Sequence, residues 1–202
     1  MEENRLKKFV EKYGKKYSEM LGIDARKEKF KWFLAALLFG APIREENAMK
    51  TYLLFEKNGL VTPEKIIEAG WDRIVSLLDE GGYTRYDFKT ADKIIEACKN
   101  IIEKGGIEKL TMEGRHALKI AKGIGDVTID IFLRELGMPH HPSKYAIMAA
   151  KNHGLMEGNK IKKFEEIDEI NLEIALMKLG RDYCRKNKCK ECPFPCRKGK
   201  NL

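Results

Sequence analysis

Apolar positions recur every three to four residues along almost the whole chain, which is the period of an amphipathic helix. No stretch alternates apolar and polar residues for long enough to predict a strand. Helices are therefore expected at residues 4–20, 24–39, 44–57, 63–69, 72–79, 88–103, 112–122, 127–136, 143–152 and 165–183. This pattern predicts an all-α chain with short connections.

Capping residues and glycines support these boundaries. Asp24 can accept hydrogen bonds at the start of helix 24–39, and Thr62 followed by Pro63 is typical of a first helical turn. Glycines that can end a helix follow four of the expected elements, at Gly59, Gly105, Gly137 and Gly154. The sequence has no low-complexity linker, so any two lobes are expected to pack rather than to hang on a flexible tether.

The composition is that of a globular protein with one or two domains, since 202 residues with 43% hydrophobic and 35% charged side chains can bury a core. The longest apolar run, residues 32–43, is too short to span a bilayer, and the N-terminus has no signal-peptide core. We therefore expect a cytoplasmic location and no membrane partner. Glutamine is absent and Lys and Glu are abundant, a bias reported for hyperthermophile proteins.

The net charge of +8 favours a polyanionic partner, with a solvated basic surface as the alternative. Much of this charge lies near the C-terminus, where eight cations face only Asp182 and Glu191, an excess of six. The eight are Arg181, Arg185, Lys186, Lys188, Lys190, Arg197, Lys198 and Lys200. Most of the excess positive charge therefore lies at one end of the chain.

Four of the five cysteines lie within this basic segment, as Cys184-x4-Cys189-x2-Cys192-x3-Cys196. Disulfides are one interpretation, but the cytoplasm keeps thiols reduced and so short a loop would strain two bridges. Thiolates bind soft metals, and one compact loop favours a 4Fe-4S cluster, in which each thiolate binds a different iron. Zinc is the alternative, because the spacing does not exclude it. Cys98, far away in a predicted helix, is expected to be a small buried hydrophobic residue.

The stretch "AKGIGDVTID" places two glycines between predicted helices and indicates a helix, a glycine hairpin at residues 122–127 and a second helix. The first backbone N–H groups of the second helix have no partner within it, and the helix dipole favours an anion there. Asp126 is interpreted as a first-turn residue that the dipole favours. An ordinary helix connection is the alternative. The expected DNA contacts are Lys122, Gly123, Ile124, Gly125 and Thr128.

The "GIG" hairpin, followed about sixty residues later by "GRDYCRKNKCKECPFPC", resembles the endonuclease III branch of the helix-hairpin-helix DNA glycosylases. The resemblance implies a six-helix barrel lobe at residues 23–136. It also implies a second lobe, formed by residues 1–22 with 137–202, that holds a 4Fe-4S cluster in the loop 184–196. The implied function is monomeric binding of double-stranded DNA and cleavage of the glycosidic bond of a wrong or damaged base that is flipped out of the stack.

Several positions depart from the family pattern. The cysteine loop has shorter first and last gaps, and no amide stands near Ala41, where a base-replacing glutamine is often found. Bifunctional members have a lysine at the position of Val127, and members of both kinds have an aspartate where this chain has Lys144, between Ser143 and Tyr145. Lys144 is the candidate catalytic residue, because a desolvated lysine can attack the sugar C1′ and form a Schiff base. The alternatives are a surface lysine and a phosphate contact.

Three functions remain open at this stage. The first is a DNA N-glycosylase, with or without AP lyase activity, whose catalytic group has moved. The second is a non-catalytic DNA or lesion binder on the same scaffold. The third is an iron–sulfur protein with an RNA or a protein partner.

Overall fold

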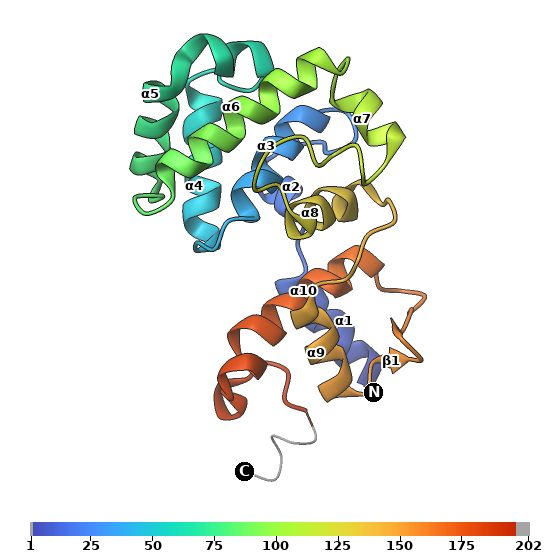
Figure 1. Ribbon diagram of the computed structural model, residues 1–202. Helices are drawn as coiled ribbons and strands as arrows, with labels where there is room; N and C mark the ends of the chain where they lie inside the picture. Colours follow the sequence, from blue (N-terminus) through green and yellow to red (C-terminus); the bar gives the residue numbers. More distant parts are fainter. Residues whose placement is uncertain (1, 197–202) are drawn as a thin grey trace. The chain divides into compact units, whose positions relative to one another are not determined.

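The structure is a computed structural model that describes residues 2–196. The described chain is all-α apart from one short antiparallel pair of strands (Figure 1). No helix in this part of the chain is long and apolar enough to cross a membrane. The basic residues Arg197, Lys198 and Lys200 lie outside the described residues.

The chain forms two compact units. The first, Leu21–Met138, is called the hairpin unit here, and the second, which combines Met1–Met20 with Pro139–Leu202, is called the cysteine unit. The sequence placed the boundaries at residues 22/23 and 136/137, two residues from these positions. The cysteine unit is formed by both ends of the chain, so contacts between residues far apart in the sequence hold it together.

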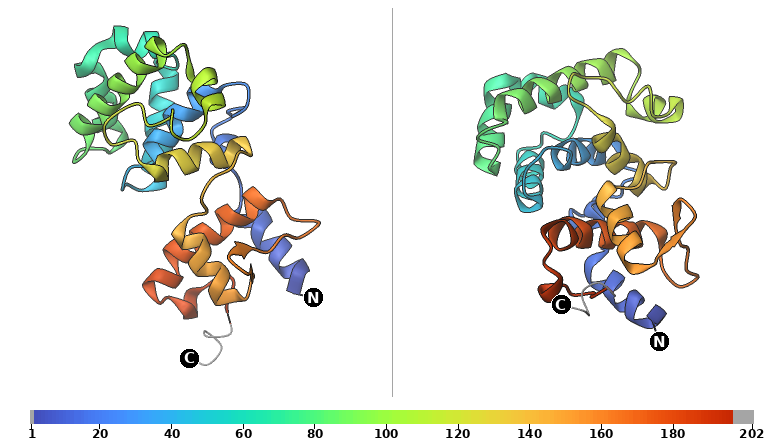
Figure 2. Two further views of the ribbon diagram at one scale, coloured as in Figure 1. Left: turned by 45° about the vertical axis from the view of Figure 1, so that its right-hand side comes forward. Right: turned by 60° about the horizontal axis from the view of Figure 1, so that its bottom comes forward.

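The hairpin unit consists of α3 (Lys29–Phe39), α4 (Glu45–Lys57), α5 (Pro63–Gly81), α6 (Asp87–Glu103), α7 (Ile107–Glu113) and α8 (Asp126–Leu136). Its centre is α3, which is apolar on almost every side and contacts α4, α7 and α8. The Trp32 indole N–H donates to the carbonyl of Phe132 in α8 at 3.0 Å, and the Phe33 and Phe132 rings meet edge to face. Figure 2 shows α5 and α6 lying against each other, as their extensive contacts also indicate. This packing holds α8, which begins directly after the glycines, against α3.

The cysteine unit consists of α1 (Glu2–Tyr13), α2 (Tyr17–Met20), α9 (Lys144–His153), β1 (Met156–Glu157), β2 (Lys160–Ile161), α10 (Glu169–Asp182) and the 3-10 turns η1 (Cys184–Lys186) and η2 (Cys189–Glu191). Helix α10 is central and packs on α9 and α1. A Cβ at Gly180 would overlap the carbonyl of Tyr145, and one at Gly14 would overlap that of Asn171. Both glycines therefore allow helix contacts that a larger residue would prevent.

Several predicted boundaries are confirmed. The Thr62 hydroxyl accepts from the Lys65 N–H and Pro63 is the first residue of α5. Each of the four predicted terminating glycines follows a helix end and has a positive φ. Cys98 is 2% exposed within α6, as expected, and burial raises the pKa of its thiol to about 12.

Other boundaries are wrong. The single helix expected at residues 4–20 ends at Tyr13 and resumes at Tyr17, because the chain breaks at Gly14 against α10. Helix α3 begins at Lys29, and Asp24 instead accepts from the N–H groups of Arg26 and Lys27 in a preceding turn, both at 3.2 Å. The β1–β2 hairpin was not foreseen. The two helices expected at 63–69 and 72–79 are confirmed, because Gly70 interrupts α5 with a φ of 77° and a ψ of 166° that are not helical.

The most consequential error concerns the segment before the glycines. A helix was expected at residues 112–122, but α7 ends at Glu113, and Gly114 has a φ of 89° that a helix cannot continue. Turns and irregular backbone occupy residues 114–125. The described structure therefore has a glycine turn followed by α8, without a regular helix leading directly into the turn.

Candidate functional site

The two glycines of the turn differ in what they do for the fold. Gly123 has a φ of 89°, a left-handed conformation that favours glycine. Gly125 is the N-cap of α8 and has an ordinary φ of −100°. Between them, the Ile124 side chain is buried and its N–H donates to the carbonyl of Ala121 at 3.1 Å. The side chain and the N–H of Ile124 are thus both engaged, and only its carbonyl, an acceptor, remains for the predicted DNA contact.

Gly125 is unusual among the described glycines, because it alone combines an ordinary φ with open space where a Cβ would lie. Every other described glycine either has a positive φ or would clash with neighbouring atoms. The fold therefore does not require glycine at this position. Its small size leaves the first amides of α8 open to close approach from outside.

Cations offset the carboxylates beside the turn. The Arg115 guanidinium lies 2.8 Å from Asp130 Oδ1 and 3.7 Å from Asp126, and Lys119 Nζ lies 3.1 Å from Asp126. Asp126 therefore does not present an isolated negative charge to an approaching anion.

The other predicted DNA contacts at the turn differ in their exposure to solvent. Lys122 is exposed, and its N–H donates to Glu96 Oε2 at 3.0 Å, so its side chain remains as a donor. Thr128 is 4% exposed and its hydroxyl packs against Gly40, which removes it from the surface of the turn. Val127 is 65% exposed.

A cation that sequence reasoning missed lies over Gly123. Lys93 belongs to α6, and its Cε and Nζ would lie 3.1 and 3.8 Å from a Cβ at Gly123. Lys93 forms no ion pair with any described residue, and burial lowers its pKa from the ordinary value. No spacing rule connects positions 93 and 123, so only the fold could reveal this neighbour.

The cysteine loop, residues 184–196, winds through η1 and η2 with all four thiols half-buried. Asn187 turns the chain between them with a φ of 54°, the only positive φ at a described non-glycine residue. Burial is the main cause that raises the pKa of Cys184 and of Cys192, and neighbouring thiols add to it. The loop thus brings all four thiols within electrostatic range of one another.

Four thiols are the donor set of an iron–sulfur or a zinc site, so the chemistry of the loop fits a soft metal. Among the described residues, no three His, Cys, Asp or Glu side chains surround a common position that could hold a metal ion. The described residues therefore show four thiols in one short loop but no coordination geometry for a metal ion.

Lys144, the candidate catalytic residue, is the exposed first residue of α9. Its Nζ lies 5.2 Å from the centre of the Tyr145 ring, and Arg185 Nη1 donates to the Tyr145 hydroxyl at 2.9 Å. The Arg185 guanidinium carbon lies 5.6 Å from the same ring centre. Two cations from separate elements thus flank one tyrosine, an arrangement that attracts an anion.

A buried carboxylate in the same unit was also missed. Glu173 of α10 is 6% exposed, its Oε2 lies 2.7 Å from His140 Nε2, and its Oε1 lies 3.5 Å from the Ser143 amide. Glu173 thereby holds the segment that leads into α9 and Lys144.

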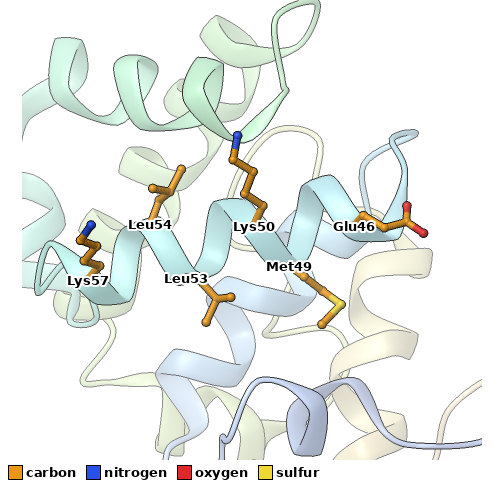
Figure 3. A pocket seen from close by; sticks show the side chains of 6 residues that line it. All are labelled: Glu46, Met49, Lys50, Leu53, Leu54 and Lys57. Atoms are coloured by element: carbon orange, nitrogen blue, oxygen red, sulfur yellow. The ribbon is translucent and has the colours of Figure 1, made fainter.

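A surface hollow of about 460 Å³ lies along α4, away from these residues in the sequence. Its lining comes from one helix, with Met49 and Leu53 on one side and Lys50 and Leu54 on the other (Figure 3). Lys50 is engaged with the carbonyl of Glu80 at 2.6 Å. The hollow includes none of the residues that the sequence singled out.

Comparison with protein-family models, with curated proteins and with solved structures finds no match to this chain. Its function is therefore inferred from the glycine turn, the cysteine loop and the Lys144 region.

Proposed function

We propose that this chain is a base-excision-repair protein that binds duplex DNA and acts as a DNA N-glycosylase of the endonuclease III type. The observation that carries the proposal is Gly125, a glycine that the fold does not require at the start of a helix whose N-cap makes no side-chain hydrogen bond. Close approach of a DNA phosphate gives this position a reason to be glycine. Lys122 and Lys93 supply positive charge beside the turn.

The charge distribution supports a polyanionic partner. The hairpin unit has nineteen Lys and Arg against nineteen Asp and Glu, whereas the cysteine unit has twenty against twelve. The whole net charge of +8 therefore belongs to the unit with the cysteine loop. We assign phosphate attraction mainly to this unit and close backbone contact to the glycine turn.

We assign Cys184, Cys189, Cys192 and Cys196 as the ligands of a 4Fe-4S cluster, with zinc as the alternative metal. The cluster would hold the basic loop in shape for DNA and would take no part in bond cleavage. Loss of the metal should therefore weaken DNA binding.

A second function, lesion binding without catalysis, is favoured by one specific observation. Lys144 is exposed and shares the Tyr145 ring with Arg185, and two cations at one ring suit a phosphate contact. Both functions need duplex DNA, so the binding test comes first.

The test is duplex affinity, measured by fluorescence anisotropy for wild type and Gly125→Ala. We expect the variant to fold with an unchanged melting temperature, because the new Cβ meets open space, and to bind duplex DNA several-fold more weakly. Val127→Ala is the matched control, since it trims an exposed side chain two residues away and should bind normally. Equal affinity of Gly125→Ala and wild type would argue against phosphate contact at the turn.

A further inference from the structure

The cysteine loop contains one aromatic side chain, Phe194, which contacts residues from two helices distant in sequence. Its ring stacks on Phe9 of α1 with centroids 4.9 Å apart and an interplanar angle of 27°. The His153 ring of α9 lies 5.1 Å away, and the Arg5 guanidinium of α1 lies 5.1 Å from the ring centre. Phe194 thus sits among aromatic and cationic partners from α1 and α9.

Other contacts tie the same loop to these helices. Cys184, Cys192 and Phe194 pack against a buried core that includes Leu6 and Phe9 of α1. The Cys192 thiol donates to the carbonyl of Phe194 at 3.3 Å. Cys184 is hydrogen-bonded to Asn152, the residue before His153. Adjacent residues of α9 therefore hold both the start and the end of the loop.

We infer that helix α1 is part of the metal site, with Phe194 as the positioning residue that locks the cysteine loop onto Phe9 and Arg5. This inference rests on the proposed metal-binding role of the four cysteines. A short loop retains its metal better when its backbone is already ordered, because less conformational entropy is lost when the metal binds. The stacked rings and the Arg5 guanidinium supply that order from the opposite end of the chain.

The experiment measures metal in full-length protein purified without oxygen. Wild type is expected to contain about four irons per chain. Iron and zinc are quantified, and release to a chelator is followed by absorbance. Phe194→Ala should release its metal about tenfold faster than wild type, because the variant has neither the ring stacking nor the burial of the aromatic side chain. Phe194→Tyr keeps the ring and should release at the wild-type rate.

The contribution of α1 is tested from its own side. Phe9→Leu and Arg5→Gln change no residue of the loop and should each accelerate release. Phe164→Ala is the matched control, since Phe164 packs on the same core outside the loop and its removal should lower the melting temperature without faster release.

Release at the wild-type rate from Phe194→Ala, Phe9→Leu and Arg5→Gln would overturn the inference, and so would a wild-type protein that binds neither iron nor zinc. Equal acceleration by Phe164→Ala would also overturn it, because general destabilisation would then explain the effect. Duplex affinity is read on the same preparations. A protein that retains metal as expected but ignores DNA would refute the proposed function and leave the inference standing.

Discussion

Position 144 holds a lysine where the resembled family has an aspartate, and this single exchange changes the chemistry available at the sugar. A carboxylate stabilises the positive charge that develops on the sugar as the base leaves, whereas an ammonium repels it. Lys144 could help only as a neutral amine that attacks C1′. Lys144 is exposed and shares the Tyr145 ring with Arg185, so two cations lie where they can contact a phosphate.

Borohydride trapping decides between these roles of Lys144. Duplexes with uracil, hypoxanthine, oxidised or alkylated bases, or an abasic site, are incubated with wild type and with Lys144→Ala. If Lys144 is the nucleophile, its amine forms an imine with the sugar aldehyde, which borohydride reduces to a stable adduct that Lys144→Ala lacks. Lys151→Ala, an exposed lysine on the same helix, is the matched control and should keep the adduct.

The other outcomes are equally informative. Release of a base without an adduct would assign catalysis to a group other than Lys144. Tight lesion binding with neither base release nor adduct on any duplex would reject the enzyme and leave the lesion binder.

Residues with a recognisable spacing could be predicted from the sequence, and residues gathered by the fold could not. The four cysteines are close in sequence, so their proximity follows from the loop itself. Lys93 and Glu173 reach their places only because α6 passes Gly123 and α10 passes Ser143. Thr128 was misplaced because periodicity alone did not show that its hydroxyl faces α3.

At the scale of elements, boundaries set by local chemistry were predicted well and those set by tertiary contacts were not. Thr62 caps its own helix, so the start of α5 was visible in the sequence. Residues 114–122 have helical periodicity, but Leu118 and Ile120 are buried in an irregular segment. The Asn100 side chain donates to the Ile120 carbonyl at 2.5 Å. A side chain of α6 therefore supplies the hydrogen bond that this carbonyl would have received from its own backbone if residues 114–122 were helical.

The α9–α10 contact gives a prediction about one helical glycine. Gly180→Ala should gain about 1 kcal/mol of helix propensity. The added methyl overlaps the Tyr145 carbonyl, however, and overpacking of this kind costs about 1–3 kcal/mol even after partial relaxation. Because an overlap with backbone cannot be relieved by a rotamer change, we expect a lower free energy of unfolding, measured in urea. We also expect weaker duplex binding, because the overlap would displace Tyr145 from Arg185.

Gly125→Ala is the matched control for this variant, because it adds the same methyl in open space and should leave the unfolding midpoint unchanged. A Gly180→Ala protein as stable as wild type would show that α9 and α10 can separate freely. The contact could then not be what positions Arg185.

At the scale of the whole molecule, charge is divided between the units more sharply than the sequence analysis foresaw. The excess near the C-terminus was visible as a run of cations, but the neutrality of the hairpin unit emerged only when the unit boundaries were known. In the proposed function, the neutral unit with the glycine turn and the basic unit with the cysteine loop would make different contributions to DNA binding. The first suits short-range contact, which salt affects little, and the second suits long-range attraction, which salt screens.

This division predicts how salt changes the affinity. Wild-type duplex binding should weaken steeply as salt rises, because each neutralised phosphate releases its condensed counterion. Replacing Arg185, Lys186, Lys188 and Lys190 with glutamine should lower duplex affinity at low salt. It should also flatten the slope of log affinity against log salt concentration by about one for each phosphate that the variant no longer neutralises. All four side chains are exposed, so the replacements should leave the fold intact.

The matched control replaces four exposed lysines of the neutral hairpin unit, Lys57, Lys65, Lys104 and Lys109, with glutamine. Both variants remove four positive charges, so their salt dependence would change equally if duplex affinity depended on net charge alone. We expect the control to keep nearly the wild-type slope, because its charges belong to the unit assigned to short-range contact. An equally flattened slope in the two variants would mean that duplex affinity depends only on the total charge of the protein. A slope near zero in wild type would rule out duplex DNA as the partner and favour a protein partner for the cysteine loop.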